Sequence, residues 1–427
     1  MGTLIGIGFG SYTGGGGVPS TLDFYAPLTS SITLTTGTAA STFTRATTAT
    51  CIDSGGLVTS CASGEARFEG STHNGTNDWT AHANSKGILI EEARTNRSRY
   101  SIFTAANWFE SNCTLDDGSD TAPDGTTTAA GLITTNTSST THRVQPLNAS
   151  YASGYNALDN ICVSFYVKPS EVTWVQFSNS SATAGTEETF FNLSGAGSIG
   201  TDQHTSSGIE YNSTTGFYRC WVVYSLQGAD TTLDFARIYS ASADATTTYS
   251  GHATNPELIF WGHQIEVGSF PTSYIPAAGS DVIRNADVLT YDYQPSATTG
   301  SMVMTTTPIV AANDAVALGH NTSCLYMTGN PRESDDGTNQ VVFGNPTVNT
   351  ETNYGLTWED AGTPETATYK DGSQINTGAL DAGFDPSTNE LGIGCQGSTG
   401  TLQQSGTYKE IKIYTDAKDQ TFMEAAT

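Results

Sequence analysis

The stretch Gly87-Ile88-Leu89-Ile90-Glu91-Glu92-Ala93-Arg94-Thr95-Asn96 decides how this chain is organised. It opens as an apolar run and ends in charged and polar residues. Adjacent residues of an extended chain point to opposite faces, so Glu91 and Glu92 cannot flank one bond as a catalytic acid pair. We expect instead that one of the two carboxylates pairs with Arg94, and that the pair fixes this stretch to the β-structure that follows it.

The composition predicts an all-β protein. A length of 427 residues suggests two or three domains at roughly 100–200 residues each. Charged residues make up only 14% of the chain, against about 25% in ordinary globular proteins, and Thr, Ser, Gly and Asn are abundant in their place. Thr favours strands, whereas Gly, Asn and Ser favour turns. We expect a small N-terminal anchoring region followed by two β-sandwich (jelly-roll) domains.

The charge argues against two classes of partner. The net charge is −26, from 16 Lys and Arg against 42 Asp and Glu. Such a chain repels nucleic-acid phosphates and anionic lipid surfaces, so we expect neither nucleic acid nor membrane as a partner. No apolar window reaches the ~18 residues of a membrane span, and the N-terminus lacks the pattern of a secretory signal. The acidity itself keeps a surface soluble, or it serves a specific basic partner.

The cysteines and the known chemical motifs offer little. There are seven cysteines, an odd number without Cys-x-x-Cys spacing, which argues against a zinc site or a disulfide scaffold. Cys51 and Cys61 flank Ser54-Gly55-Gly56 in an expected hairpin and form one candidate disulfide, although such bonds are rare in a reducing cytoplasm. No nucleophile elbow, zinc-protease, Walker or Rossmann motif is present. We therefore predict no catalytic residue, no cofactor and no metal.

Four segments follow from the patterning. Residues 1–20 form a Gly-rich arm that we expect to dock on another subunit or protein, because Gly loses the most entropy on ordering. Residues 21–96 form a β-rich anchoring region, residues 97–290 a first sandwich and residues 298–427 a second.

Strong period-2 alternation in residues 217–224 and 258–267 is typical of sandwich strands. In the second run the alternation puts one set of side chains on one face (Ile259, Trp261, Ile265 and Val267) and another on the opposite face (Gln264 and Glu266). The pair Asp371-Gly372 predicts a hairpin turn.

These segments resemble, in order, virion proteins of tailed bacteriophages. The resemblance is carried by a lead-in at residues 43–46, 53–58 and 65–68, by the opening stretch, by residues 261–276, and by Arg284, Ala286 and Asp287. It implies that residues 97–290 are similar to carbohydrate-binding jelly rolls. Residues 367–374, 391–394 and 406–414 resemble the end of a laminin-G or concanavalin-like sandwich, whereas residues 301–358 match it only loosely.

Ligand contacts are expected from exposed aromatic residues, since an aromatic ring packs on the C–H face of a sugar. Trp79, beside Asn77-Asp78, and Trp358, beside Glu359-Asp360, lie in polar contexts and are the candidates. Ordinary packing is the alternative for both. Trp174, Trp221 and Trp261 lie in strong strands and are expected in the core.

Other polar residues give weaker hypotheses. The acidic turns 116–120 and 333–337 have oxygen ligands that calcium accepts, but no EF-hand spacing, so solvated turns are the simpler interpretation. His263 is expected to be a half-buried strand residue.

Our leading hypothesis is a non-enzymatic structural or adhesive component of a tailed-phage virion, assembled in the bacterial cytoplasm and displayed on the virion surface. The resemblance implies attachment to other virion proteins through the N-terminal region, a homotrimer, and host surface glycans as ligands. Two alternatives stay open. One is a capsid or neck decoration protein without a ligand. The other is a glycan-depolymerising tailspike, which needs two carboxylates at glycosidase separation.

Overall fold

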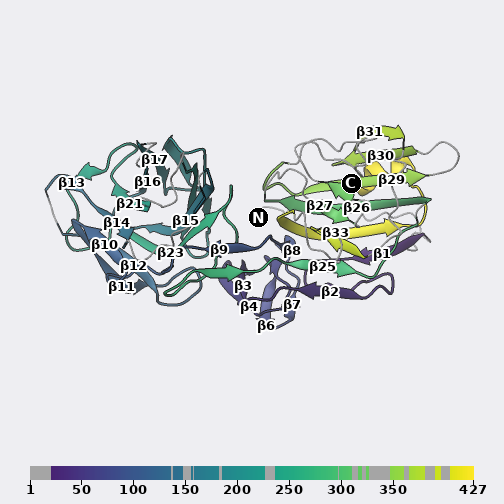
Figure 1. Ribbon diagram of the computed structural model, residues 1–427, viewed down its shortest axis with the longest axis horizontal. Coiled ribbons are helices and arrows are strands. Elements are labelled where there is room, and N and C mark those ends of the chain that lie inside the picture. The colour runs from purple at the N-terminus through teal and green to yellow at the C-terminus, as the bar shows by residue number, and fades with distance from the viewer. Residues whose placement is uncertain are drawn as a thin grey trace, which may run out of the picture.

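The computed structural model describes residues 21–135, 138–147, 155–156, 158–181, 185–226, 236–296, 298–309, 316–319, 324–326, 347–359, 365–379, 390–395 and 404–427. Their regular structure is almost entirely β-strand, with one short helix, α1 (Gln420–Ala426). This confirms the predicted all-β class. Two lobes lie at either end of the molecule, with small hairpins between them (Figure 1). Among the described residues, no helix has the length and apolarity to span a membrane.

The first lobe consists of two six-stranded antiparallel sheets. One sheet has the order β10 (Trp108–Ser111), β14 (Arg143–Pro146), β21 (Ala236–Ala241), β16 (Trp174–Ser181), β17 (Gly185–Asn192), β18 (Ser198–Asp202). The other has the order β11 (Cys113–Asp120), β12 (Ala129–Thr134), β23 (Leu258–Val267), β15 (Asn160–Pro169), β20 (Tyr218–Ser225), β19 (Ser206–Tyr211). A short ribbon pairs β13 (Thr140–Thr141) with β22 (Thr248–Tyr249).

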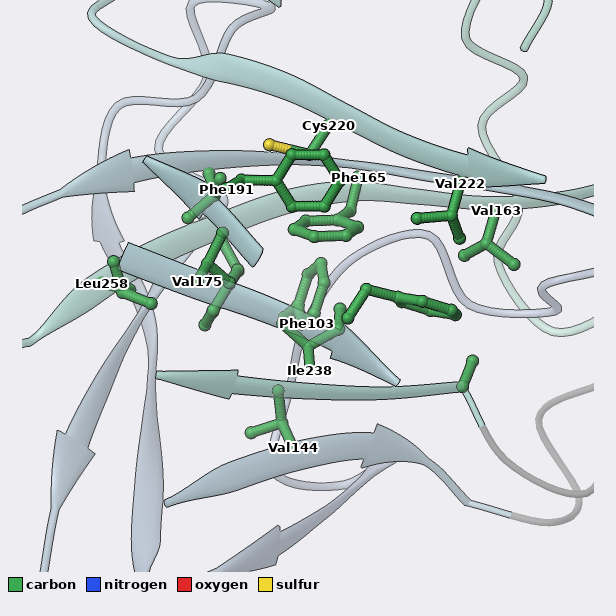
Figure 2. Close-up of a cluster of buried hydrophobic side chains, with 14 of the residues drawn as sticks. Phe103, Val144, Val163, Phe165, Val175, Phe191, Cys220, Val222, Ile238 and Leu258 are labelled. Atoms are coloured by element: carbon green, nitrogen blue, oxygen red, sulfur yellow. The ribbon is translucent and has the colours of Figure 1, made fainter. Parts of the chain in front are cut away.

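Apolar side chains from both sheets fill the space between them (Figure 2). Phe165 of β15 lies centrally, stacked 6.5 Å from Phe177 of β16 and edge-on to Phe191 of β17. Both sheets keep one apolar face, as the alternation of their sequences predicts. Burial of this apolar area is the main stabilisation of the lobe.

A bulge in β23 changes the expected pattern of one strand. Tyr166 pairs with Trp261 while Ser164 pairs with Gln264, so β23 carries one extra residue between these pairs. Gly262 takes a positive φ of 65° at this point, as glycine does at bulges. The prediction that Ile259, Trp261, Ile265 and Val267 share a face was therefore wrong: Ile259 and Trp261 join a separate small cluster, and Ile265 joins the main core.

The second lobe is also built from two sheets. The larger has the order β31 (Ser373–Ala379), β30 (Glu365–Lys370), β29 (Thr352–Glu359), β26 (Thr299–Pro308), β33 (Gly406–Tyr414), β8 (Gly87–Ile90), β5 (Phe68–Glu69), and β1 (Leu22–Ala26) also pairs with β33. The smaller has the order β2 (Ser41–Thr44), β25 (Val288–Tyr291), β32 (Leu391–Ile393), β27 (Val316–Gly319), β28 (Cys324–Tyr326). Asp371 and Gly372 take positive φ values of 47° and 77° in the β30–β31 turn, which confirms the predicted hairpin.

Residues 21–96, expected to form a separate anchoring region, supply strands to this second lobe. β1 and β8 follow one another along the same edge of β33, while β26 occupies its other edge. β2 pairs with β25 in the smaller sheet. Phe24, Ile88 and Ile90 are fully buried in the same core as Tyr408 and Ile411. The reason is that Phe24, Ile88 and Ile90 are buried against the sheets of the C-terminal part, whereas Val58 packs against the first sandwich. Residues 1–20 lie outside the described residues.

Small two-stranded elements lie between the lobes (Figure 1). They are the hairpins β3 (Ala49–Ile52) with β4 (Val58–Cys61) and β6 (Thr72–Gly75) with β7 (Asp78–Thr80), and the ribbon β9 (Arg94–Asn96) with β24 (Val282–Arg284). The ribbon carries the chain from the opening stretch into the first sandwich and back again. The two crossings are thus hydrogen-bonded to each other.

A fragment of residues 298–427 is expected not to fold alone. Without residues 21–96, β33 loses both partners on one edge, and the core loses Phe24, Ile88 and Ile90. Far-UV circular dichroism with thermal melting measures this. A fragment of residues 94–284, which retains both sheets of the first sandwich, is the matched control and should melt cooperatively. A cooperative melt of the fragment 298–427 would contradict the shared core.

Candidate functional site

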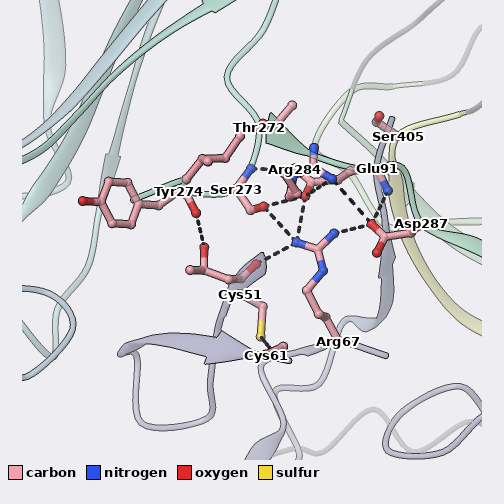
Figure 3. Close-up of polar contacts among 12 residues, drawn as sticks. Cys51, Cys61, Arg67, Glu91, Thr272, Ser273, Tyr274, Arg284, Asp287 and Ser405 are labelled. Carbon is pink, nitrogen blue, oxygen red and sulfur yellow. Dashed lines mark hydrogen bonds and ion pairs between the residues drawn. The ribbon is translucent and has the colours of Figure 1, made fainter. Parts of the chain in front are cut away.

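The charged residues of the sequence motifs meet in one buried cluster between the two sandwiches (Figure 3). We call it the junction cluster, and it consists of Arg45, Arg67, Glu91, Arg284 and Asp287. The side chains of all five are at most 1% exposed. These residues come from four separate parts of the sequence, each at the end of a strand or just beyond it.

Arg67 is the centre of the cluster. Its Nη1 donates to Glu91 Oε2 at 2.9 Å, to the Thr50 carbonyl at 2.7 Å and to Ser273 Oγ at 2.8 Å. Its Nη2 donates to Asp287 Oδ2, and the other oxygen of Asp287 accepts from Arg45 at 2.9 Å. A buried charge is stable only when it is paired and hydrogen-bonded, and this geometry meets both conditions.

The cluster ties both sandwiches to the same groups. Glu91 directly follows β8 and Asp287 directly precedes β25, and two hydrogen bonds join them: the Glu91 amide donates to the side-chain Oδ2 of Asp287, and the Asp287 amide donates to the Glu91 carbonyl. Ser273, beyond β23 of the first sandwich, donates from both its amide and its hydroxyl to Glu91, at 2.7 and 2.6 Å. Glu91 therefore connects the sheets of the second lobe to the first.

A second layer of contacts extends from the opening stretch to β23. Arg94 donates to the Val267 carbonyl and pairs with Glu92. This confirms the prediction that Arg94 pairs with one of the two carboxylates. Asn96 accepts from the Ile265 amide at 3.0 Å and donates to the Ile275 carbonyl at 2.7 Å. Residues 87–96 and 261–276, which the sequence resemblance identified as separate segments, therefore contact each other directly.

The charges of the cluster shift one another's pKa values. Burial alone would raise the pKa of Glu91, but Arg284 and Arg67 outweigh it and lower the pKa to about 2. Burial opposes the charge of Arg67 as well, yet Asp287 and Glu91 raise its pKa above the usual value. For Arg284 burial dominates and lowers the pKa. Glu91 is therefore ionised at neutral pH and holds the joint through its ion pairs with Arg67 and Arg284.

The candidate disulfide cysteines lie beside the cluster as free thiols. Cys51 of β3 and Cys61 of β4 are both buried, with their sulfur atoms 3.8 Å apart (Figure 3). They are diagonal neighbours rather than opposite residues, because Cys51 pairs with Thr59 and Cys61 with Ala49. Hydrogen bonding with Cys61, burial and nearby negative charge raise the pKa of Cys51 well above its usual value. These thiols pack as apolar core.

Both tryptophans proposed as ligand platforms are buried, so those predictions were wrong. Trp79 is 8% exposed and packs 5.7 Å from Phe68. Trp358 is 2% exposed, lies over Gly300 and donates its indole N–H to the Ser296 carbonyl. The polar neighbours Asn77, Asp78 and Glu359 are exposed, so the polar context does not extend to the indoles. Trp261 is buried as expected, whereas Trp174 and Trp221 are only half-buried.

The other polar residues singled out in the sequence, in the acidic segment 116–120 and at His263, do not form a site. The acidic residues 116–120 lie in β11, where Asp120 pairs with Lys168 at 2.5 Å. Across the residues that the structure describes, no group of three metal-ligating side chains converges. The second acidic turn, 333–337, lies outside the described residues. His263 is fully buried rather than half-buried, and desolvation lowers its pKa to about 3.

The outer face of the first sandwich carries a group of residues that the sequence analysis missed. Val144 and Ile238 point into the core, so their neighbours on β14 and β21 point outward. With β10 these strands present Phe109, Arg143, Gln145 and Tyr239, which we call the aromatic–arginine patch. Phe109 lies opposite Gln145 and Arg143 opposite Tyr239. The period-2 alternation of residues 143–146 and 236–241 could have indicated this face.

The patch combines an exposed ring with unused polar groups. Phe109 is 41% exposed. The Arg143 guanidinium lies 5.9 Å from the centre of the Phe109 ring and 5.7 Å from that of Tyr239, and it donates to the Tyr239 hydroxyl at 3.0 Å. Gln145 is only 8% exposed, and within the described part of the chain its Oε1 accepts no hydrogen bond. Aromatic surface beside unsatisfied polar groups is the composition of a ligand-binding surface.

Comparison with known proteins leaves the family of this chain undefined. No protein-family model and no curated protein matches it. Among solved structures, a Trypanosoma rangeli sialidase in complex with 2,3-difluorosialic acid is 11% identical over 83% of this chain and 65% of the sialidase, with a TM-score of 0.26. Domains LG4-5 of the mouse laminin alpha1 chain are 8% identical over 75% of this chain and 94% of theirs, with a TM-score of 0.22. The chain thus spans 65% of the length of that sialidase.

Replacing Glu91 by Gln should destabilise the protein by about 3–5 kcal/mol at pH 7, because it leaves Arg67 and Arg284 buried with one fewer negative partner. Glu351→Gln, which removes an exposed partner of Lys409, should cost less than about 1 kcal/mol. Urea unfolding measures both.

The stability difference between wild type and Glu91→Gln should depend on pH, with a sign set by the pKa shift of Glu91. The folded-state pKa of Glu91 is about 2, below the usual value of 4.5. Its contribution is therefore complete above the unfolded-state value and is lost as the pH falls toward about 2. The difference in free energy of unfolding between wild type and Glu91→Gln should therefore shrink as the pH falls from about 4.5 to about 2. A difference of equal size at pH 7 and pH 2 would contradict an ionised Glu91.

The Cys51 and Cys61 thiols should resist a thiol reagent in the folded protein and react fully in denaturant, because only exposed thiolates are nucleophilic. Mass spectrometry after alkylation in each state measures this for each cysteine. A Cys51–Cys61 bond in protein purified without oxidant would contradict the free pair.

Proposed function

We propose that the chain is a non-enzymatic adhesive component of a tailed-phage virion, and that its first sandwich binds glycans of the host surface. The aromatic–arginine patch is the observation that carries the proposal. A sugar offers an apolar C–H face and a rim of hydroxyl groups, and this patch offers Phe109 for the first and Arg143, Gln145 and Tyr239 for the second.

The placement of the patch supports a display role. It lies on the sheet β10–β14–β21–β16–β17–β18, whereas the junction cluster contacts the first sandwich through Ser273, and Asn96 contacts it through Ile265 and Ile275, beyond or on β23 of the other sheet. The joint and the patch therefore do not compete for the same surface. A fixed joint lowers the entropy lost when several copies bind one surface together.

The virion assignment rests on the sequence resemblance, in which residues 43–46, 53–58, 65–68, 87–96, 261–276 and 284–287 recur in order. Residues from all of these segments except 53–58 contact one another at the junction, which gives a physical reason for them to occur together. We further propose a homotrimer attached through its N-terminal region. Three weak sugar sites on one particle would bind with high avidity.

Binding of purified protein to an array of bacterial surface glycans tests the proposal. Phe109→Ala should weaken the binding of any captured glycan by about tenfold, because a stacking ring is removed. Tyr211→Ala is the matched control, since Tyr211 is 44% exposed on β19 of the opposite sheet, and it should bind as the wild type does.

Two outcomes would contradict this proposal. Shortened polysaccharide chains after incubation with the protein would indicate the depolymerase alternative. Absence of binding to every glycan, together with virions that fall apart when the protein is deleted, would indicate the decoration alternative.

A further inference from the structure

We infer that the aromatic–arginine patch selects sugars that carry a carboxylate, such as uronic or sialic acids, over neutral sugars. The inference rests on the proposed glycan binding and adds the chemical class of the ligand. It starts from Arg143, whose guanidinium forms no ion pair within the described residues.

Five of the described arginines pair with a carboxylate, whereas Arg143, like Arg97 and Arg219, does not. Acidic residues outnumber basic ones by 42 to 16, so a basic side chain readily finds a carboxylate. Elsewhere Arg45, Arg67, Arg94, Arg99 and Arg284 each lie within ion-pair distance of one. Arg143 is instead held by the Phe109 and Tyr239 rings and by the Tyr239 hydroxyl. This is a local positive charge on a protein of net charge −26.

The acidic residue on the neighbouring strand β10 does not neutralise Arg143. Glu110 follows Phe109 on β10, but its Oε1 accepts the Leu115 amide at 2.7 Å. It pairs in register with Val144, whose side chain is in the core, so it lies on the inner side of the strand. On the outer face the positions facing Arg143 in neighbouring strands are Ser111 and Tyr239, and neither is a carboxylate.

Arg143 also keeps donors unused. A guanidinium has five N–H groups in a fixed planar arrangement, and one hydrogen bond from its side chain is accounted for, to Tyr239. Its Nε is buried and, like Gln145 Oε1, has no hydrogen-bond partner among the described residues. A carboxylate matches a guanidinium in shape and charge, whereas a neutral hydroxyl offers only a single weaker contact.

One further group of the patch fits such a sugar. Phe109 supplies an exposed ring for the C–H face. The carboxylate thus contributes selectivity through Arg143, and the stacked ring contributes affinity that both kinds of sugar share.

The test compares two trisaccharides that differ only in the oxidation state of C6, tri-galacturonate and tri-galactose, by calorimetry with the full chain. We expect tri-galacturonate to bind at least about tenfold more tightly, from the strength of a charge-assisted hydrogen bond. Arg143→Gln should lose that preference. Arg99→Gln, which removes the same charge from a residue paired with Asp281, should keep it. The preference should also shrink as salt rises from 0.05 to about 0.5 M, because salt screens exposed charges.

The outcomes separate this inference from the proposed function. Equal binding of both trisaccharides, or a preference that survives Arg143→Gln, would overturn the inference and leave glycan binding intact. Binding only of neutral glycans on the array would also overturn the inference and leave glycan binding intact. Binding of no glycan at all would overturn both. A thermal melt shows that each variant is folded, and Arg143→Lys, which keeps the charge but not the planar fork, should retain part of the preference.

Discussion

A buried charge must be paired, and this requirement holds the molecule together. Three guanidinium groups and two carboxylates of the junction cluster are almost completely removed from water. Each of them is stable only while its partners stay in place, and those partners belong to both sandwiches and to the segment between them. Apolar packing of equal area would tolerate small displacements. Charge-assisted hydrogen bonds from Arg67 to Glu91 and Asp287 tolerate far less, because their strength depends on distance and direction. The cluster therefore fixes geometry more than it adds stability.

This constraint explains the unusual domain structure. The chain enters the second sandwich first, through β1, β2, β5 and β8, crosses to the first sandwich along β9, and returns along β24 to complete the second. The first sandwich is thus inserted into the second. Both crossings run side by side in one ribbon, and the junction cluster lies where that ribbon begins and ends. An insertion held at one place by paired charges presents its outer sheet in a constant orientation, which suits a module for display.

The sequence predicted the elements better than their partners. Alternation in residues 217–224 and 258–267 predicted β20 and β23, and Asp371-Gly372 predicted the β30–β31 turn, because these signals are local. The pairing of β1 and β8 with β33 involves residues more than 300 positions apart, and nothing local in residues 22–26 or 87–90 specifies that partner. The bulge at Gly262 reversed the faces of β23, since a single extra residue inverts a period of two. Trp79 and Trp358 were wrongly predicted to be exposed, because residues adjacent in sequence point to opposite faces of a strand. Phe109, Arg143 and Tyr239 become a patch only when three strands distant in sequence are aligned.

The central claim is that the junction cluster holds the two sandwiches in one fixed relation. The most direct measurement is the distribution of distances between spin labels introduced through an unnatural amino acid at Ile199 and Ile375, which are 38% and 42% exposed, one on each sandwich. Wild-type protein should give a single narrow distribution, and Glu91→Gln should broaden it under conditions where both sandwiches remain folded. A broad distribution in the wild type, or no change when Glu91 is replaced, would contradict the account.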